Sequence, residues 1–489
     1  MLSESGQRTW PHGVQFSIKW GTPPALPLEN SKSTNSDFVI SHSSKHLLVM
    51  DKLQTIATSK SLDLDTLDFA QAMDARDPLA HLRSEFEIPT KAQVTANASL
   101  DDTPCTYLCG NSLGLLPKRS RRVITEELDE WAHRGVVGHH HHSLGRPWVD
   151  YREQIVEKMA PLFGAKPVEV GVMNSLTVNV HLMLASFYKP SGKRTKILIE
   201  AKAFPSDHYA VESQIQWHNL PKDAMLLATP RAGERTLRTE DILQLIEDQG
   251  EQIAVVMLSG VQYYTGQVFE MEKITRAAQA KGCIVGWDLA HAAGNVPVQL
   301  HDWNVDFACW CTYKYMNSGP GGISGFFVHE RYAQDPSHHR LTGWWAHDAA
   351  SRFQMTNEFT PNAGAAGFEI SCTPVLVSAS LLGSLEVFEM TSIAELRNKS
   401  ELLTAYLEFL LLKHLGDKIE IMTPAEHRGA QLSVLVQTDL FERAFTTLMA
   451  EGIICDERKP DCIRLAPVPL YNTFEDVWVC VNVLRKALE

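Results

Sequence analysis

Short apolar runs alternate with segments of helical spacing from about residue 168 onward, and this alternation constrains the fold more than any other feature of the chain. The runs VGVMN, KILIE, MLLATP and IAVVMLS are each followed by such a segment, and CIVGWD, VDFACWC and GGISGFFVHE continue the series. Alternation of this kind is typical of a mostly parallel sheet with helices packed on it. The sequence therefore predicts an α/β fold with this sheet in its large domain.

The pattern changes after about residue 345, where long helical stretches such as ELLTAYLEFLLLKHL come before the expected strands KIEIM, QLSVLV and CIRLAPV. We expect a large α/β domain over 151–345 and a smaller α+β domain over 346–489. Residues 1–60 are rich in Ser, Thr, Pro and Asn without a sustained period, which predicts a weakly ordered extension. We expect residues 61–150 to contribute to the small domain and to the rim of the functional site.

The charge and the cysteines restrict the partners and the compartment. The chain has 489 residues and a formal net charge of −13 at pH 7, so we expect a small-molecule ligand and not nucleic acid or an anionic membrane. The nine cysteines are scattered, several in apolar runs such as FACWC, which is typical of buried, reduced thiols. Apolar stretches end well short of about 18 residues and no secretory signal pattern opens the chain, so we expect a cytoplasmic protein without a membrane segment.

A lysine stands directly after the apolar run VDFACWC, in the stretch CTYKYMNSGPGG. At the end of a buried strand Lys314 loses hydration, which is unfavourable unless its charge is paired or given up. Asp288 ends the run CIVGWD and has the same need for a partner. The stretch NSLT can offer the N–H groups of a helix start to a phosphate. Ordinary helix capping, and a structural lysine whose charge reaches solvent, are the alternatives that the sequence leaves open.

These groups follow strands whose carboxyl ends meet at one edge of a parallel sheet, where such sheets bind ligands. Pyridoxal phosphate requires this combination: a lysine that forms a Schiff base, an acid opposite the ring nitrogen and a helix start for the phosphate. Burial favours the neutral amine that this reaction needs. His291, three residues after Asp288, can hydrogen-bond that carboxylate or be a satisfied core residue.

Five motifs resemble kynureninase, a fold type I enzyme that depends on pyridoxal phosphate: YLCGNSLGLLPK, AKAFPSDHYA, SGVQYYTGQ, the segment from GWDLAHAAG to TYKYMNSGPGG, and IRLAPVPLYN. The resemblance runs from about residue 64 to the end. It implies hydrolysis of the Cβ–Cγ bond of L-kynurenine or its 3-hydroxy form to L-alanine and anthranilate or 3-hydroxyanthranilate, within tryptophan degradation and NAD synthesis. It also implies a homodimer with active sites at the subunit interface, in which Trp344 of one subunit reaches the cofactor phosphate of the other.

The resemblance also implies roles for single residues. Lys314 would be the Schiff-base lysine and the base that moves the α-proton, and Asp288, supported by His291, would pair with the pyridine nitrogen. Tyr264 would assist proton transfer, and Arg464 would bind the substrate carboxylate through two hydrogen bonds. Further cofactor contacts are implied at Leu176, Thr177, Phe204, Pro205, Ser206, Asp207, Ser259, Tyr313 and Cys372, and further substrate contacts at Ser112 and His139.

Two stretches depart from the family pattern. Where family members often have Arg-x-Ser-Asn-Pro, this chain has FEISCTP, which puts Glu369 and Cys372 near the usual arginine and asparagine. A thiol cannot replace both the donor and the acceptor of an amide, so a changed aryl substrate is an open alternative. The run from His139 to His142 suggests a metal site, but consecutive residues do not converge on one ion, so we predict no metal.

Two further hypotheses stay beside hydrolysis. One keeps the fold and the cofactor but changes the reaction to transamination or desulfuration. A desulfurase needs a mobile nucleophilic cysteine, and Cys372 lies in a Pro-bounded segment that suits this poorly. The other hypothesis is a non-catalytic scaffold, which predicts a protein without cofactor absorbance.

Overall fold

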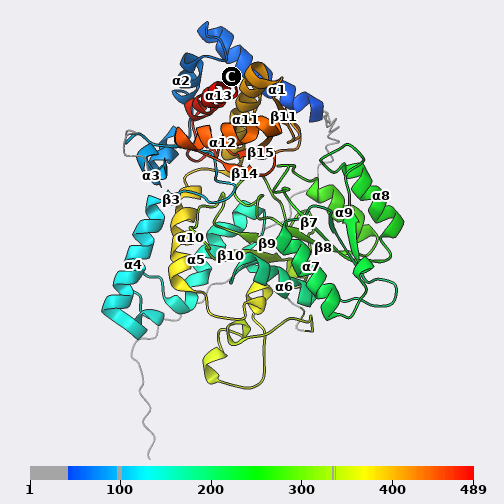
Figure 1. Ribbon diagram of the computed structural model, residues 1–489. Helices are drawn as coiled ribbons and strands as arrows, with labels where there is room; N and C mark the ends of the chain where they lie inside the picture. Colours follow the sequence, from blue (N-terminus) through cyan, green and yellow to red (C-terminus); the bar gives the residue numbers. More distant parts are fainter. Residues whose placement is uncertain (1–41, 96–101, 333–334, 336) are drawn as a thin grey trace, which may run out of the picture. The chain divides into compact units, whose positions relative to one another are not determined.

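The computed structural model describes residues 42–95, 102–332, 335 and 337–489. Its large domain is built on a seven-stranded sheet with the strand order β4-β10-β9-β8-β7-β5-β6 (Figure 1). The strands are β4 (Val170–Val172), β5 (Lys196–Glu200), β6 (Met225–Ala228), β7 (Ile253–Ser259), β8 (Ile284–Asp288), β9 (Phe307–Cys311) and β10 (Ser324–Val328). β10 pairs antiparallel with both of its neighbours, and the other strands run parallel to one another, which confirms the predicted α/β class.

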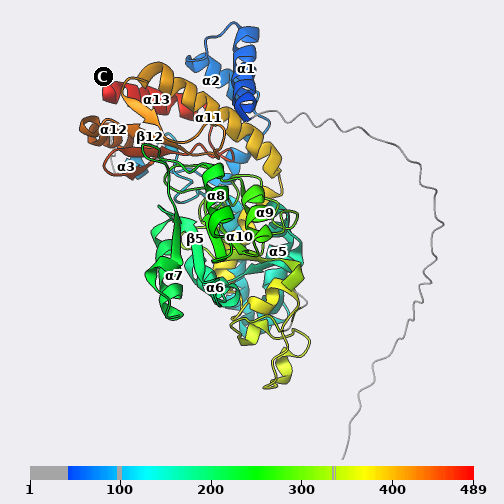
Figure 2. The same cartoon turned by 90° about the vertical axis from the view of Figure 1, so that its right-hand side faces the viewer.

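Helices cover both faces of this sheet, because its strands are apolar on both sides. In β7, Val255 and Met257 pack with α6 (Leu176–Phe187) and α7 (Pro205–Trp217) in one hydrophobic cluster. Val256 and Leu258 point to the other face, as the two-residue period of a strand requires. That face is covered by α5 (Tyr151–Met159), α8 (Thr239–Gln249), α9 (Met271–Ala280) and α10 (Val375–Phe388) (Figure 2). α4 (Lys118–Arg134) packs against α10.

A second core belongs to the C-terminal part of the chain. Its sheet has the order β11-β12-β15-β14, and all of its pairings are antiparallel. The strands are β11 (Ile419–Ile421), β12 (Leu432–Val436), β14 (Asp456–Arg458) and β15 (Cys462–Leu465). The helices of this core are α1 (His42–Lys60), α2 (Leu67–Asp74), α11 (Ile393–Leu415), α12 (Thr438–Ala450) and α13 (Phe474–Leu488). α1 lies beside α11 and α2 beside α13, so the start of the described chain joins the C-terminal core.

Short elements complete the chain. Two-residue strands pair β1 (Phe86–Glu87) with β3 (Leu116–Pro117) and β2 (Thr106–Tyr107) with β13 (Ile453–Ile454), and α3 is Lys91–Thr95. The 3₁₀ turns are η1 (Ala80–Glu85), η2 (Gly135–His139), η3 (Trp148–Asp150), η4 (Ala160–Phe163), η5 (Pro167–Glu169), η6 (Lys222–Ala224), η7 (Glu330–Tyr332), η8 (Trp344–Ala346), η9 (Arg352–Gln354) and η10 (Gly364–Phe368).

Two expected boundaries differ from the structure. Residues 42–60 form α1, although we expected weak order over 1–60; residues 1–41 of that range lie outside the described residues. α10 packs against α4 and α5 in the large core, although we assigned everything after 345 to the small domain. The apolar sequence of α10 is equally suited to either core, so its spacing alone does not decide which one it joins.

Among the described residues, no single helix is long and apolar enough to cross a membrane. α10 and α11 together pass that test of length and composition, but they are bent by 79° at the break between them.

Candidate active site

A cavity of about 200 Å³ opens where the carboxyl ends of β7, β8 and β9 meet the N-termini of α6 and α7. It is lined by Ser175, Leu176, Thr177, Phe204, Ser206, Asp207, Ser259, Val261, Tyr263, Asp288, Ala290, His291, Tyr313 and Lys314. Ten of the seventeen residues predicted from the sequence are among them. The sheet order brings these residues together from segments that are up to about 140 residues apart in the chain.

Lys314 follows β9 and is only 9% exposed. Its Nζ lies 5.7 Å from the ring centroid of Phe204 and 5.9 Å from that of Tyr313. Phe204 stands at the N-cap of α7, so the amine and this ring border the same cavity. A ligand ring in the cavity would therefore have an aromatic neighbour and a lysine amine within reach.

Two acidic side chains lie together at the floor of the cavity. Asp288 ends β8, and its Oδ1 accepts a hydrogen bond of 2.7 Å from the backbone N–H of Ala290. Asp207 lies in the first turn of α7, and its Oδ1 has no hydrogen-bond partner. Burial, and then the charge of Asp288, raise the pKa of Asp207 well above its ordinary value. A cationic group in the cavity, such as a protonated ring nitrogen, would satisfy this pair.

His291 adds an uncharged ring to the same wall. Its side chain is buried, and its Nδ1 has no hydrogen-bond partner. Burial lowers the pKa of His291 well below its ordinary value, and the charges of Lys314 and Arg464 lower it further. The imidazole is therefore neutral and has a free nitrogen for a ligand.

The start of α6 forms the opposite end of the cavity. Ser175 precedes the helix in an extended conformation, and its side chain makes no capping hydrogen bond. The N–H groups of the first turn, at Leu176 and Thr177, are therefore not satisfied by this residue. A helix start of this kind binds phosphate through its N–H groups and its dipole. With the unpartnered atoms of Asp207 and His291, the residues of the cavity fit pyridoxal phosphate.

The structure places Tyr264 outside the cavity and its neighbour Tyr263 inside. The ring of Tyr264 packs with Met422, Leu435 and Cys462 of the C-terminal sheet, whereas that of Tyr263 meets Phe204 edge-on at 5.0 Å. The tyrosine doublet in SGVQYYTGQ was the signal, but nothing local tells which of the two faces the site. Ser175, Val261 and Ala290 also line the cavity and were missed, although each lies within two positions of a predicted residue.

Arg464 lies on β15, behind the wall of the cavity. Its guanidinium pairs with Asp456 at 2.8 Å, and its Nη1 donates a hydrogen bond of 2.6 Å to the carbonyl of Tyr263. Ser112 is in the loop after β2. In the same loop, the N–H of Gly114 donates a hydrogen bond to the carbonyl of Tyr313. The cavity is not lined by Arg464, by Ser112 or by Pro205, which is the first residue of α7.

His139 lies in the histidine-rich loop 138–148, beside a second cavity of about 420 Å³. This cavity is mainly apolar and is lined by Glu127, Trp131, Gly135, Val136, His139, Trp148, Val375 and Leu376. His139 and Trp148 meet edge-on, with ring centroids 5.3 Å apart. His139 therefore lies apart from the cavity of Lys314 within one chain.

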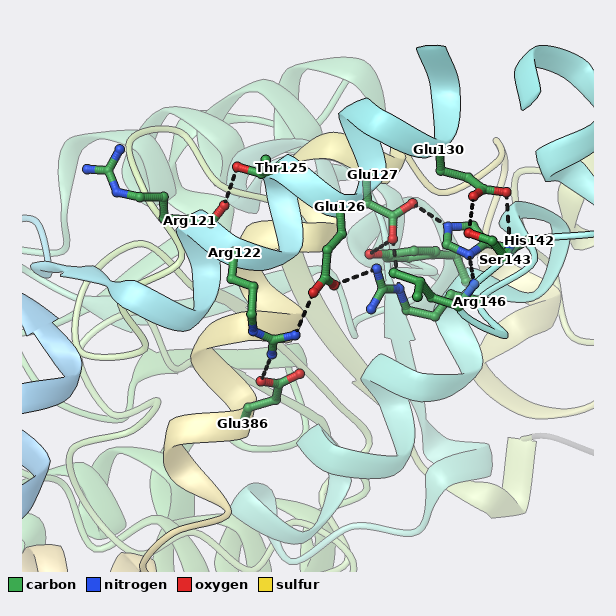
Figure 3. A network of polar contacts seen from close by, with 12 residues as sticks. Arg121, Arg122, Thr125, Glu126, Glu127, Glu130, His142, Ser143, Arg146 and Glu386 are labelled. Atoms are coloured by element: carbon green, nitrogen blue, oxygen red, sulfur yellow. Dashed lines mark hydrogen bonds and ion pairs between the residues drawn. The ribbon is translucent and has the colours of Figure 1, made fainter. Parts of the chain in front are cut away.

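Two buried glutamates of α4 hold this loop (Figure 3). Glu127 accepts hydrogen bonds from His142 Nε2 at 3.0 Å, Arg146 Nε at 2.8 Å and Trp148 Nε1 at 2.9 Å. Glu130 accepts from the backbone N–H of Ser143 at 3.0 Å. His142 is thus a structural residue of the loop.

The departures near η10 have separate explanations. Glu369 is buried and pairs with Arg152 at 2.9 Å, and it also accepts from the N–H of Val172 at 2.9 Å. Its charge is therefore matched by a residue 217 positions earlier. Cys372 is exposed, and so is half of the Trp344 side chain. Neither residue lines the cavity of Lys314.

In the described part of the chain, one group of side chains has the spacing of metal ligands: Glu169, His301 and His329, with ligand atoms within 4.8 Å of one another. Glu169 already accepts hydrogen bonds of 2.9 Å from His301 Nδ1 and from the backbone N–H groups of Lys166 and Glu330. Through these hydrogen bonds, Glu169 connects η5 to the segment after β8 and to the end of β10, which accounts for the grouping without a metal ion.

Several solved structures share this fold. The chain matches the cystine C–S lyase C-DES in complex with cysteine persulfide, with a TM-score of 0.64 and 19% identity over 78% of this chain and 97% of that one. It also matches the cysteine desulfurase CsdA of Escherichia coli, with a TM-score of 0.67 and 18% identity over 84% of this chain and 98% of that one. A C-DES mutant with glycine linked to its PLP cofactor matches with a TM-score of 0.65 and 19% identity, over 81% and 99% of the chains.

The fold and the site together define a fold type I pyridoxal-phosphate enzyme. Residues 396–484 match the family model of the kynureninase C-terminal domain. Kynureninase 2 of Aspergillus clavatus is 49% identical over 449 residues, which are 87% of this chain and 97% of the relative. Kynureninase of Monosiga brevicollis is 48% identical over 454 residues, or 88% and 98%. The chain belongs to the kynureninase family, which confirms the resemblance seen in its motifs.

Proposed function

We propose that this protein hydrolyses L-kynurenine, 3-hydroxy-L-kynurenine or both to L-alanine and anthranilate or 3-hydroxyanthranilate, with pyridoxal phosphate as cofactor. The observation that carries the proposal is the convergence of Lys314, Asp288 and the start of α6 on one cavity, in a chain of the kynureninase family. The cofactor, when bound, withdraws electrons from the substrate and thereby makes the Cβ–Cγ bond cleavable once water has added to the γ-carbonyl.

The side chains of the cavity have complementary tasks in this proposal. Lys314 binds the cofactor covalently through Nζ and moves the α-proton of the substrate. Asp288 would be the acid that pairs with the ring nitrogen, and the neutral His291 would offer its ring to the cofactor without adding charge. Burial raises the pKa of Tyr313, so its hydroxyl keeps its proton and can donate it as a hydrogen bond. Phe204 stacks against the ring.

We further propose that the protein works as a homodimer. Several large apolar side chains are exposed in or beside η2, η8 and η9, among them Val136 at 77% and Met355 at 72%. Phe353 contacts both His140 and Trp344, with centroids 5.7 and 5.5 Å away, so η2, η8 and η9 form one continuous surface. Exposed apolar surface of this kind is typical of a subunit interface. A second subunit would bring Trp344, His139 and Cys372 to the substrate end of a neighbouring site.

A reducing compartment such as the cytoplasm is part of the proposal. All nine cysteines are free, and seven of them are buried. Unpaired thiols in this number are typical of proteins that are kept reduced.

The test is the release of fluorescent anthranilate from L-kynurenine by the full chain with pyridoxal phosphate, with 3-hydroxykynurenine compared in parallel. Lys314→Ala should lower the turnover about 10²–10⁴-fold and remove the visible absorbance of the lysine-bound cofactor. Lys273→Ala, an exposed position on α9, is the control and should match the wild type. A cofactor-loaded wild type that cleaves neither substrate would refute the proposal, and sulfide release from L-cysteine would favour desulfuration.

A further inference from the structure

Glu200 is a buried acid that the proposed chemistry leaves unused. It is the last residue of β5 and is only 3% exposed. In the part of the chain that the structure describes, it forms no ion pair with a basic side chain. Its contacts are with Ser259, whose Oγ lies 2.5 Å from Oε1 and whose backbone N–H lies 3.4 Å from Oε2. A buried carboxyl without a cation has a strong reason to stay neutral.

Ser259 connects this acid to the cavity. It ends β7, the strand between β5 and β8, and is paired in register with Asp288. Ser259 lines the cavity of Lys314, whereas Glu200 lies behind it. Glu200, Ser259 and Asp288 therefore form a row across three neighbouring strand ends.

The charges around Glu200 favour its neutral form. Burial raises the pKa of Glu200, and the charge of Asp288 raises it further. Asp207 is shifted in the same direction, and Lys314 is the basic group that lines the cavity. On the other side, Lys202 and Arg235 line a small hollow next to Glu200, but Arg235 pairs with Glu420 at 3.7 Å. Both pKa shifts favour the neutral forms of Glu200 and Asp207.

The protonation of Glu200 decides what Ser259 offers to a ligand. An ionised Glu200 would accept the hydroxyl proton of Ser259, so that the cavity would face only oxygen lone pairs. A neutral Glu200 can donate its own proton to Ser259 Oγ and leave the serine hydroxyl free to donate into the cavity.

We propose that Glu200 is a positioning residue that stays neutral and keeps the Ser259 hydroxyl available as a donor to the cofactor. The inference rests on the proposed cofactor. It predicts that an amide can replace Glu200, because an amide N–H also donates to Ser259 without adding charge.

The experiment measures the dissociation constant of pyridoxal phosphate and the pH midpoint of its bound absorbance in the full chain. Glu200→Gln should leave the dissociation constant within about twofold of the wild type and the pH midpoint unchanged. Glu200→Ala should weaken binding about tenfold and move the midpoint. Ser259→Ala should weaken binding similarly, and the double variant no further, because the two residues act together. Glu251→Gln, at an exposed position, is the control.

Any of four results would overturn the inference. A Glu200→Gln variant that binds the cofactor as weakly as Ser259→Ala would mean that an ionised Glu200 is required. This comparison holds even if Glu200→Ala does not fold. A Glu200→Ala variant with lower thermal stability but unchanged cofactor affinity and absorbance would make the residue purely structural. A wild type that does not bind the cofactor would overturn both this inference and the proposed function, whereas normal binding by every variant would overturn only the inference.

Discussion

At the scale of single residues, the chemistry of the site follows from the burial of ionisable groups next to one another. Lys314 is enclosed between two aromatic rings, and Asp207 and Asp288 share the floor of the same cavity. Buried acids cannot all be charged, so their neighbours determine which one is. The same principle applies to Glu127 under the histidine-rich loop, where several donors surround one carboxylate.

Glu127→Ala should be strongly destabilising. It would leave the donors of His142, Arg146 and Trp148 unpaired inside the protein, at a cost of about 3–5 kcal/mol in the free energy of unfolding. The loop also carries His139, which the proposed dimer would bring to the substrate end of a neighbouring site. KM should therefore rise more than kcat falls. Urea denaturation and steady-state kinetics measure the two effects. Glu126→Ala is the matched control on the same helix and should cost less than about 1 kcal/mol; equal losses for both variants would contradict the prediction.

Prediction of single residues from the sequence worked where a residue directly follows a buried strand. Lys314 and Asp288 were found in this way, and both line one cavity, as does Ser259, which the family resemblance implied. We predicted Tyr264, whereas Tyr263 lines the cavity, because the turn that Gln262 forms decides which of the two side chains faces it. The Gln262 Oε1 accepts from the N–H groups of Tyr264 and Thr265 at 2.7 and 2.9 Å.

At the scale of elements, helix termini are held by acids from distant segments. Asp74, at the end of α2, accepts hydrogen bonds of 2.7 and 3.0 Å from the N–H groups of Phe474 and Glu475 at the start of α13. The two helices are about 400 residues apart in the chain. An acid at a helix start is favourable, but this one is also partly buried.

Asp74 should make stability depend on pH. Burial raises the pKa of Asp74 from 3.8 to about 6, so the folded protein holds this proton more tightly than the unfolded chain. The resulting contribution to the free energy of unfolding is fully present below pH 3.8 and is lost as the pH rises through about 6. Asp74→Asn should therefore lose less stability than the wild type as the pH rises from about 4.5 to about 6.5, through the raised pKa of about 6, when both are followed by urea denaturation. Parallel pH profiles of the two proteins would disprove this assignment.

The elements themselves were largely predictable, because strand and helix periods are local properties of a sequence. The apolar runs became β4, β5, β7, β8, β9 and β10. The position of α10 was not predictable, since its apolar residues could fill either core. Its contacts with α4 and α5 decide that it belongs to the large one.

At the scale of the whole molecule, the exposed apolar surface around η2, η8 and η9 is the feature on which the proposed homodimer rests. Trp344 is half exposed, and its Nε1 is tied to the carbonyl of Arg352 at 3.2 Å, so the ring is held in place on that surface. A rigid aromatic side chain is suited to an interface.

Trp344→Ala should weaken the proposed dimer. Loss of a large interface side chain raises a dissociation constant by about tenfold or more, for a cost of about 2 kcal/mol. Sedimentation of the cofactor-loaded protein over a range of concentrations measures this change. Trp217→Ala is the control, because Trp217 is 83% exposed on α7, away from the surface of η2, η8 and η9. A wild type that stays monomeric at every concentration would remove the basis of the prediction.

The sequence by itself determined the α/β class, the order of the strands along the chain, the strand ends that carry Lys314, Asp288 and Ser259, and the family. These depend on local periods and on short motifs. The tertiary structure decided which strand ends are neighbours, that Glu200 lies behind Ser259 and that Arg152 matches Glu369. Such contacts join residues that are about 60 and 217 positions apart, and burial fixes their energies only after the sheet and its helices have formed.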